Sequence, residues 1–349
     1  MMDNSRSRLK LILNVLSIAA IAWGIYWAQD HLDGYKIQVM NLIAVNAILA
    51  LSLNLVYGFT GMFSLGHAGF MAIGAYVSAL LIIPAAQKQT MYILQPIIWP
   101  FSVMEAPFFV SVVAGGLMAA LFGLIIALPV LRLGGDYLGI ATLGFAEIIR
   151  VVLTNATPIT NGALGLKGIP SYATLTVNYL WVALTVYVLV RLLSSNFGNC
   201  LKAVRDDEVA ARAMGIDTLK CRVISFCVGA FFAGVAGALQ GSLITTIDPK
   251  MYNSQFTFNI LMIVVAGGLG SITGSIVGAV VITVLLEWLR FVEDTIEIGS
   301  LVIQGIPGMR MVIFSLVLMV IILYRRQGIM GSWEFTWDKI LPRKDGEPR

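Results

Sequence analysis

Residues 107–131 read PFFVSVVAGGLMAALFGLIIALPVL, and no side chain in this run is charged. A helix needs about 20 apolar residues to cross the hydrocarbon core of a bilayer, so the run is long enough for one crossing. The rest of the chain has the same character, because 58% of its 349 residues are hydrophobic and only 12% are charged. Soluble domains carry about 25% charged residues. The composition therefore predicts an all-α, polytopic membrane helix bundle and excludes a water-soluble fold.

The hydropathy pattern predicts about ten membrane-spanning segments. They cover residues 11–28, 37–57, 68–86, 107–131, 137–153, 177–194, 223–244, 256–268, 271–290 and 309–324. The range 256–268 is short for a lipid-facing helix and ends in Gly267-Gly268-Leu269-Gly270. A half-helix or re-entrant segment fits it better. The pattern leaves the number of crossings between about eight and eleven.

The basic residues predict an orientation, because Lys and Arg favour the cytoplasmic side of short membrane loops. With the N-terminus inside, most of the 23 Lys and Arg residues fall on the cytoplasmic side. We therefore expect residues 1–10 to form a cytoplasmic N-terminus, residues 11–331 a transmembrane domain, and residues 332–349 a cytoplasmic tail. Both termini then lie in the cytoplasm.

The stretch 57–76, YGFTGMFSLGHAGFMAIGAY, has four glycines within residues 58–69. Each glycine costs about 1 kcal/mol relative to alanine in a helix interior. Broken backbone at membrane depth is tolerated only where protein or a water-filled cavity supplies its hydrogen bonds. The stretch predicts a structured turn between two half-helices, with Gly61, Gly66 and His67 as candidate residues of a translocation pathway. For His67, a hydrogen-bonded structural role is the favoured alternative.

A second candidate for the pathway is the pair Glu147 and Arg150, which lies inside a predicted span. The i, i+3 spacing places both side chains on one helix face. Ionisable residues inside a membrane span are costly and raise a functional hypothesis. The sequence leaves a structural ion pair and a contribution to the outer mouth equally open.

The longest charged interruption between spans is residues 196–222, which contain KAVRDDEVAARAMGI at 202–216. Ala, Glu, Arg and Met favour helix, and Gly215 is a natural C-terminal stop. We expect a short amphipathic helix that is offered to a partner, with a solvated connector as the alternative. Its expected apolar stripe consists of Leu201, Val204, Ala211 and Met214.

Motifs for catalysis are absent from the sequence. The P-loop pattern G-x-x-x-x-G-K-[ST], H-E-x-x-H and G-x-S-x-G do not occur, and the three cysteines have no zinc spacing. We expect no catalytic residue, metal site, cofactor or nucleic-acid partner in this chain. A transport protein of this kind must be passive, coupled to an ion gradient or driven by another subunit.

Five segments together resemble the permease subunits of bacterial ATP-binding-cassette importers for branched-chain amino acids, and are most similar to the M-type of two homologous permeases. The segments are Asn54–Tyr76, Leu131–Arg150, Lys202–Gly215 with Phe226–Gly241, Ala266–Gly278, and Tyr324–Gly331.

The resemblance implies a type II importer-like permease in the bacterial inner membrane. It also implies a homologous second permease, two cytoplasmic ATPases that use ATP, and a periplasmic substrate-binding protein; a second copy of this chain is the alternative permease partner. The loop 196–222 then becomes the segment that couples the permease to its ATPase. The coupling residues it indicates are Arg205, Asp206, Asp207, Glu208, Ala211 and Gly215. The family's E-A-A…G pattern is matched loosely, because Val209 interrupts it.

The expected activity is translocation of branched-chain or similar apolar amino acids by alternating access, without enzymatic activity in this chain. Urea, short amides or aromatic acids are alternative substrates within the same family. An ion-coupled secondary transporter with Glu147 as its titrating group is an alternative of a different class, and a passive channel is a third.

Overall fold

The computed structural model describes residues 23–92, 95–131, 135–293, 296–298, 301–303, 308–325, 327–331 and 333–334. The predicted N-terminus 1–10, most of the predicted span 11–28 and most of the tail 332–349 lie outside the described residues. Residues 23–31, at the end of that first predicted span, are helical.

The described chain is helical almost throughout, as the composition predicts. Its longer helices are α2 (Gly34–Asn54), α3 (His67–Ile82), α5 (Phe108–Val130), α6 (Asp136–Asn155), α8 (Leu175–Leu193), α9 (Asn196–Asp206), α11 (Thr218–Ile244), α12 (Ser254–Gly267), α13 (Ile272–Trp288) and α14 (Met309–Tyr324). Its shorter helices are the π-helical η1 (Leu55–Phe59), α4 (Ala85–Met91), α7 (Thr157–Thr160), η2 (Gly162–Leu164), α10 (Glu208–Ala213), η3 (Pro249–Tyr252) and η4 (Leu289–Val292). Two antiparallel pairs, β1 (Leu166–Lys167) with β2 (Thr246–Ile247) and β3 (Ile296–Ile298) with β4 (Leu301–Ile303), complete the described part.

Six of the described helices are long and apolar enough to cross a membrane, and a seventh span results if the bent pair of α3 and α4 counts as one. The helix α12 is apolar but has only 14 residues. A polytopic all-α bundle is thus confirmed, while the number of about ten crossings stays a prediction.

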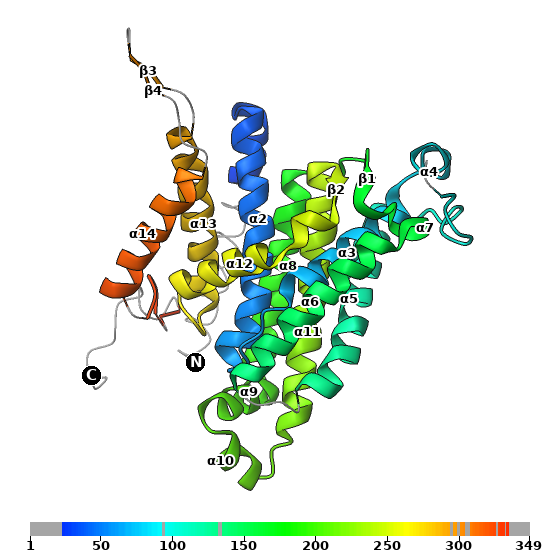
Figure 1. The fold of residues 1–349 in the computed structure, drawn as a ribbon. Helices are drawn as coiled ribbons and strands as arrows, with labels where there is room; N and C mark the ends of the chain where they lie inside the picture. The colour runs from blue at the N-terminus through cyan, green and yellow to red at the C-terminus, as the bar shows by residue number, and fades with distance from the viewer. Residues whose placement is uncertain are drawn as a thin grey trace, which may run out of the picture.

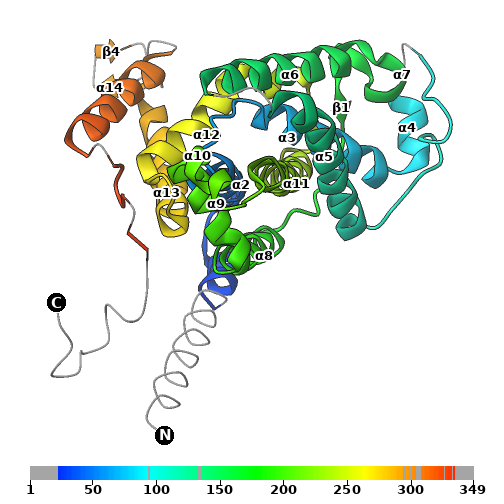
Figure 2. The ribbon, with the colours of Figure 1, turned by 90° about the horizontal axis from the view of Figure 1, so that it is seen from below.

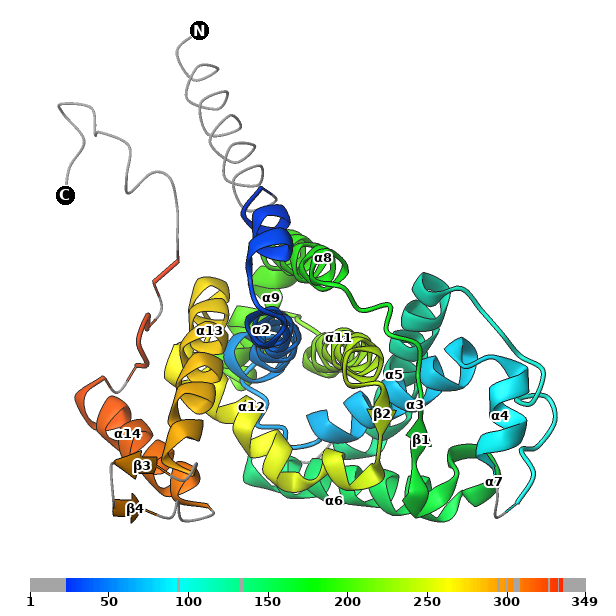
Figure 3. The same cartoon turned by 90° about the horizontal axis from the view of Figure 1, so that it is seen from above.

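The helix α11 lies at the centre of the bundle, where it packs against α5, α3 and α2 (Figures 1 and 3). Glycines make the closest contacts. A Cβ added at Gly74 would overlap the carbonyl of Gly234, and one added at Gly115 would lie 2.6 Å from the Gly74 oxygen. Small residues allow helix backbones to approach in this way in lipid, where no hydrophobic force draws helices together.

The predicted span 68–86 is wrong as a single helix. The chain leaves α3 after Ile82, passes through Ile83 and Pro84 in extended conformation, and continues as α4 at an angle of 115°. Proline at position 84 lacks an N–H and disfavours helical backbone at the residue before it, which explains the end of α3.

The bundle has two distinct ends. The helices α9 and α10 project from one end, while β1, β2, α4 and α7 lie at the other (Figure 1). From below, α9 and α10 lie in front of α2 and beside α11 (Figure 2), and α9 contacts α8, α11 and η1. We refer to residues 196–217, which comprise α9, α10 and the turn before α11, as the arm.

Candidate coupling and translocation site

The arm consists of two helices that are capped by side chains. Ser195 accepts a hydrogen bond from the Gly198 amide at the start of α9. Asp207 accepts bonds from the amides of Val209 and Ala210, at 2.8 and 3.0 Å, at the start of α10. These caps satisfy amides that lack an intrahelical partner. The expected single amphipathic helix is therefore wrong, because Asp207 is extended and starts a new helix.

The far boundary of the arm also differs from the prediction. The Asp217 side chain accepts a bond from the Lys220 amide and caps α11, which begins at Thr218. Residues 218–222, predicted as loop, are therefore the first turn of this helix. Gly215 has a φ of +83°, a conformation that glycine adopts without strain, and it follows α10 as predicted.

One face of the arm is buried against the bundle. Leu201, Val204 and Ala211 are buried, which confirms three members of the expected apolar stripe. The fourth, Met214, is wrong, because it is 82% exposed, and Val209 is 79% exposed. An apolar stripe follows one face of a helix only while each residue adds a rotation of about 100°. This rotation is interrupted at Asp207, so the stripe on α9 does not continue along α10. Two large apolar side chains therefore project from the tip.

Glu208 joins the arm to α11. Its carboxylate oxygens bind Arg212 at 2.8 Å and Arg222 at 2.6 Å, and the Arg222 side chain is only 19% exposed. Thr218 adds a hydrogen bond to the same carboxylate. Glu208, predicted to contact a partner, is thus engaged within this chain and holds α10 in place.

Arg205 connects the arm to the broken segment of the core. Its Nη1 donates a 3.2 Å hydrogen bond to the carbonyl of Gly58, in the π-helical turn that ends α2. Its Nε and Nη2 bind Asp206 at 3.0 and 2.9 Å. A Cβ on Gly61 would lie 3.0 Å from the Arg205 Cγ, and one on Gly270 would lie 3.2 Å from its Nη1. Arg205 is therefore the point where three parts of the chain meet. These are the arm, the residues around Gly58 and Gly61, and the turn between α12 and α13.

The predicted structured turn is confirmed, but the helix before it is not a half-helix, because α2 with η1 (Gly34–Phe59) is a 26-residue apolar helix long enough to cross a membrane. Residues 60–66 form no regular helix between η1 and α3. The Leu65 amide donates a 2.9 Å bond to the hydroxyl of Thr142 on α6, and Gly66 packs against the same residue. A side chain of α6 thus satisfies part of the broken backbone, as its depth in the bundle requires.

His67 is 1% exposed at the start of α3. Neither ring nitrogen makes a hydrogen bond to any described residue, although the backbone of Ser52 lies near the ring. The edge of the ring faces Phe70, with the ring centroids 6.4 Å apart. The expectation of a hydrogen-bonded histidine stays a prediction, with the Ser52 backbone as the polar group beside the ring.

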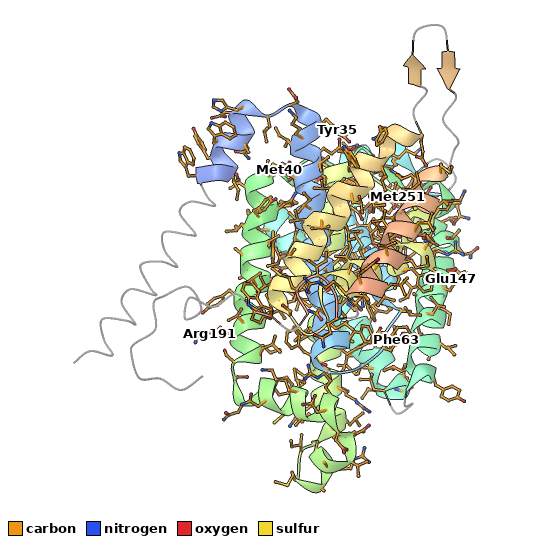
Figure 4. All side chains as sticks on the ribbon, turned by 90° about the vertical axis from the view of Figure 1, so that its left-hand side faces the viewer. Tyr35, Met40, Phe63, Glu147, Arg191 and Met251 are labelled. Atoms are coloured by element: carbon orange, nitrogen blue, oxygen red, sulfur yellow. The ribbon has the colours of Figure 1, made fainter. Side chains whose placement is uncertain are left out.

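Glu147 and Arg150 form the ion pair that their spacing predicts, with Nε and Oε2 2.5 Å apart. Their side chains are 44% and 30% exposed, so the pair lies at the surface of the bundle and not in its core. Glu147 lies between Phe63, nearer the arm, and Met251, nearer the opposite end (Figure 4). The six coupling residues thus gather on the arm, Gly61 joins them through Arg205, and Glu147 and Arg150 form a separate site.

Comparisons with known proteins place the chain in a transport family. The family described as "Branched-chain amino acid transport system / permease component" matches residues 35–323. The chain belongs to this family. It is similar to the high-affinity branched-chain amino acid transport system permease protein LivM of Escherichia coli, with 31% identity, covering 89% of this chain and 75% of the relative.

More distant relatives of this permease are also known. A probable LivM of Methanocaldococcus jannaschii is 25% identical, covering 81% of this chain and 89% of the relative. The autoinducer 2 import system permease protein LsrC of Yersinia enterocolitica is 27% identical, covering 50% of this chain and 54% of the relative. No solved structure matches the chain. Family membership and the apolar helices together make the chain a multi-pass inner-membrane protein and a transport component.

Sequence reasoning missed one polar residue of this permease, Asn54. It is buried at the end of α2, where Nδ2 donates to the Ser271 carbonyl at 2.8 Å and to Ser275 Oγ at 2.7 Å. Its Oδ1 accepts a 2.9 Å bond from the Gly270 amide. The sequence contained a signal for Asn54, because an asparagine inside an apolar run must find hydrogen-bond partners. Among the described residues, no group of three His, Cys, Asp or Glu side chains is placed to hold a metal.

Proposed function

We propose that the chain is the membrane-spanning permease subunit of an ATP-driven importer that translocates branched-chain or similar apolar amino acids. Its partners are a homologous second permease, two cytoplasmic ATPases that hydrolyse the ATP, and a periplasmic substrate-binding protein. The family and the similarity to LivM support the substrate class. The similarity to the autoinducer 2 permease shows why uptake of other solutes must be measured alongside.

The observation that carries the mechanism is the bond between Arg205 and Gly58. An arm that projects from the bundle is bonded to the broken end of α2, and its tip exposes Val209 and Met214 to a partner. A movement of the arm is therefore transmitted to the π-helical turn that precedes the non-helical residues 60–66. ATP-driven closure of the ATPases moves the arm and switches the bundle between outward-open and inward-open states.

The charge distribution supports an orientation with the arm in the cytoplasm. The arm end carries Arg191, Lys202, Arg205, Arg212, Lys220 and Arg222. Basic residues next to spans favour the cytoplasmic side. This orientation places both termini in the cytoplasm and β1, β2, α4 and α7 on the periplasmic side.

The test replaces Arg205–Glu208 with four alanines in the complete importer. Uptake of leucine, isoleucine and valine and the ATPase activity stimulated by loaded binding protein are measured in proteoliposomes. We expect the variant to insert and assemble but to lose both uptake and stimulation. Undiminished uptake contradicts the proposal, and wild-type uptake that survives ATP depletion but collapses with an ionophore assigns the chain to ion-coupled transporters instead.

A further inference from the structure

Glu147 and Arg150 are the only charged residues in the apolar stretch Tyr137–Asn155 of α6. An ion pair that faces lipid is costly, and charged side chains in spans almost always face the bundle interior or a water-filled cavity. The buried face of α6 carries Thr142, Ala146 and Ile149, so the pair is not sealed inside this chain. The flank of α6 that bears it must therefore meet water or another subunit in the assembled importer.

The ion pair leaves several of its nitrogen and oxygen atoms free to bind a ligand. The bond from Arg150 Nε to Glu147 Oε2 is the only hydrogen bond that either side chain makes within the described part of the chain. The two terminal nitrogens of the guanidinium remain available, as does Glu147 Oε1. Parallel guanidinium nitrogens bind a carboxylate through two hydrogen bonds, and a free carboxylate oxygen accepts a bond from an ammonium group.

The position of the pair fits a substrate that enters from the end opposite the arm. At 1.5 Å per residue, Arg150 and Glu147 lie about 7.5 and 12 Å from the Asn155 end of α6. The helix α6 contacts η3 and α12, where Met251 and Phe258 keep exposed apolar side chains. Elements that pack against α6 therefore carry exposed apolar side chains.

We propose that Glu147 and Arg150 hold the charged head group of a zwitterionic amino acid on its way through the importer. Arg150 binds the α-carboxylate through its two terminal nitrogens, and Glu147 binds the α-ammonium group. The apolar side chain of the substrate lies toward η3 and α12. This assignment rests on the proposed function and specifies the chemical group that the pathway recognises.

The test measures uptake of radiolabelled leucine by the complete importer, with membrane level and assembly checked for each variant. Arg150→Lys keeps the charge but loses the two-pronged geometry, and Glu147→Gln keeps the shape but loses the charge. Each change is expected to lower uptake about tenfold, the effect of losing roughly one charge-assisted hydrogen bond. The double change E147R/R150E restores an ion pair in reversed order, and uptake is expected to stay low because the two charges no longer match the substrate.

The pair of Glu293 and Arg310 provides a matched control, since it is also an ion pair with partly exposed side chains (26% and 29%). The control exchange E293R/R310E is expected to leave uptake within about twofold of wild type, because the charged atoms are 3.8 Å apart, beyond hydrogen-bond distance, and join the end of η4 to the start of α14 and not to α6. An equal loss in this control overturns the proposal, as does single-variant uptake near the wild-type rate. Rescue of uptake or assembly by E147R/R150E assigns the pair to the fold and also overturns it. If wild-type protein takes up no branched-chain amino acid, the proposed function itself fails, which is a separate result.

Discussion

Nη1 of Arg205 in α9 donates a 3.2 Å hydrogen bond to the carbonyl oxygen of Gly58 in the π-helical end of α2. A π-helical turn shifts the register of backbone hydrogen bonds, and such turns occur frequently at functional sites. The carbonyl of Gly58 is thereby tied to the arm. Arm and core are linked by a charged hydrogen bond, and not by apolar packing alone.

Arg205→Ala is expected to uncouple ATP hydrolysis from uptake. A hydrogen bond to a charged group contributes about 1.5–3 kcal/mol, so we expect uptake to fall by roughly tenfold or more. The measurement is the ratio of leucine uptake to ATP hydrolysed in proteoliposomes. Lys202→Ala, on the same helix, is the control, because no hydrogen bond joins the Lys202 side chain to the described core, and its ratio is expected to match wild type. An unchanged ratio in Arg205→Ala refutes the link.

Glu208→Gln is expected to loosen α10 from α11. The substitution leaves the largely buried Arg222 without its carboxylate partner, which lowers the local stability of the arm by about 1 kcal/mol. Hydrogen exchange of the α10 amides, measured by mass spectrometry on the solubilised protein, is expected to speed up. Arg212→Gln removes only the more exposed partner and is expected to change exchange less. Equal exchange in both variants argues against a bridging role for Glu208.

The apolar tip of the arm gives a third prediction. Val209→Asp and Met214→Asp place a charge on side chains that are 79% and 82% exposed, so neither change is expected to disturb the fold. Each is expected to weaken association with the ATPase, because burying an unpaired charge at an interface is unfavourable. Copurification of the ATPase with the permease in detergent measures the effect. Lys220→Asp, at the base of the arm, is the control for added negative charge and is expected to retain the ATPase. Retention by all three variants excludes the tip as a docking surface.

The apolar helices were predictable from sequence because lipid solvation imposes a simple requirement for length and hydropathy. The range 107–131 differs from α5 by a residue at each end, and 309–324 matches α14. The break before His67 was predictable as well, since clustered glycines disfavour helix. Pattern within a segment therefore identifies where helices form and where they stop.

Two kinds of feature were not predictable from the sequence pattern. In one, a side-chain cap competes with helix propensity; in the other, residues far apart in the sequence make contact. At Asp207, helix propensity favours continuation, but the side chain binds the amides of Val209 and Ala210 and begins a new helix. Arg205 and Gly58 are separated by 147 positions, and their contact depends on how α9 packs against η1. A single sequence contains no signal for such a pairing. Candidate residues were therefore predictable, but their partners were not.

The contact between Gly74 and Gly234 gives the last prediction. Gly74→Ala places a methyl group against the Gly234 carbonyl, where backbone on both sides prevents relief. Overpacking of this kind costs about 1–3 kcal/mol, so the melting temperature of the solubilised protein is expected to fall. Gly144→Ala is the matched control, because a Cβ there meets nothing within 4 Å. That substitution is expected to stabilise α6 by up to about 1 kcal/mol through helix propensity alone. Thermal unfolding of both variants, followed by fluorescence in detergent, compares them directly. If both shift the melting temperature in the same direction, close approach of α3 and α11 is not what requires glycine at position 74.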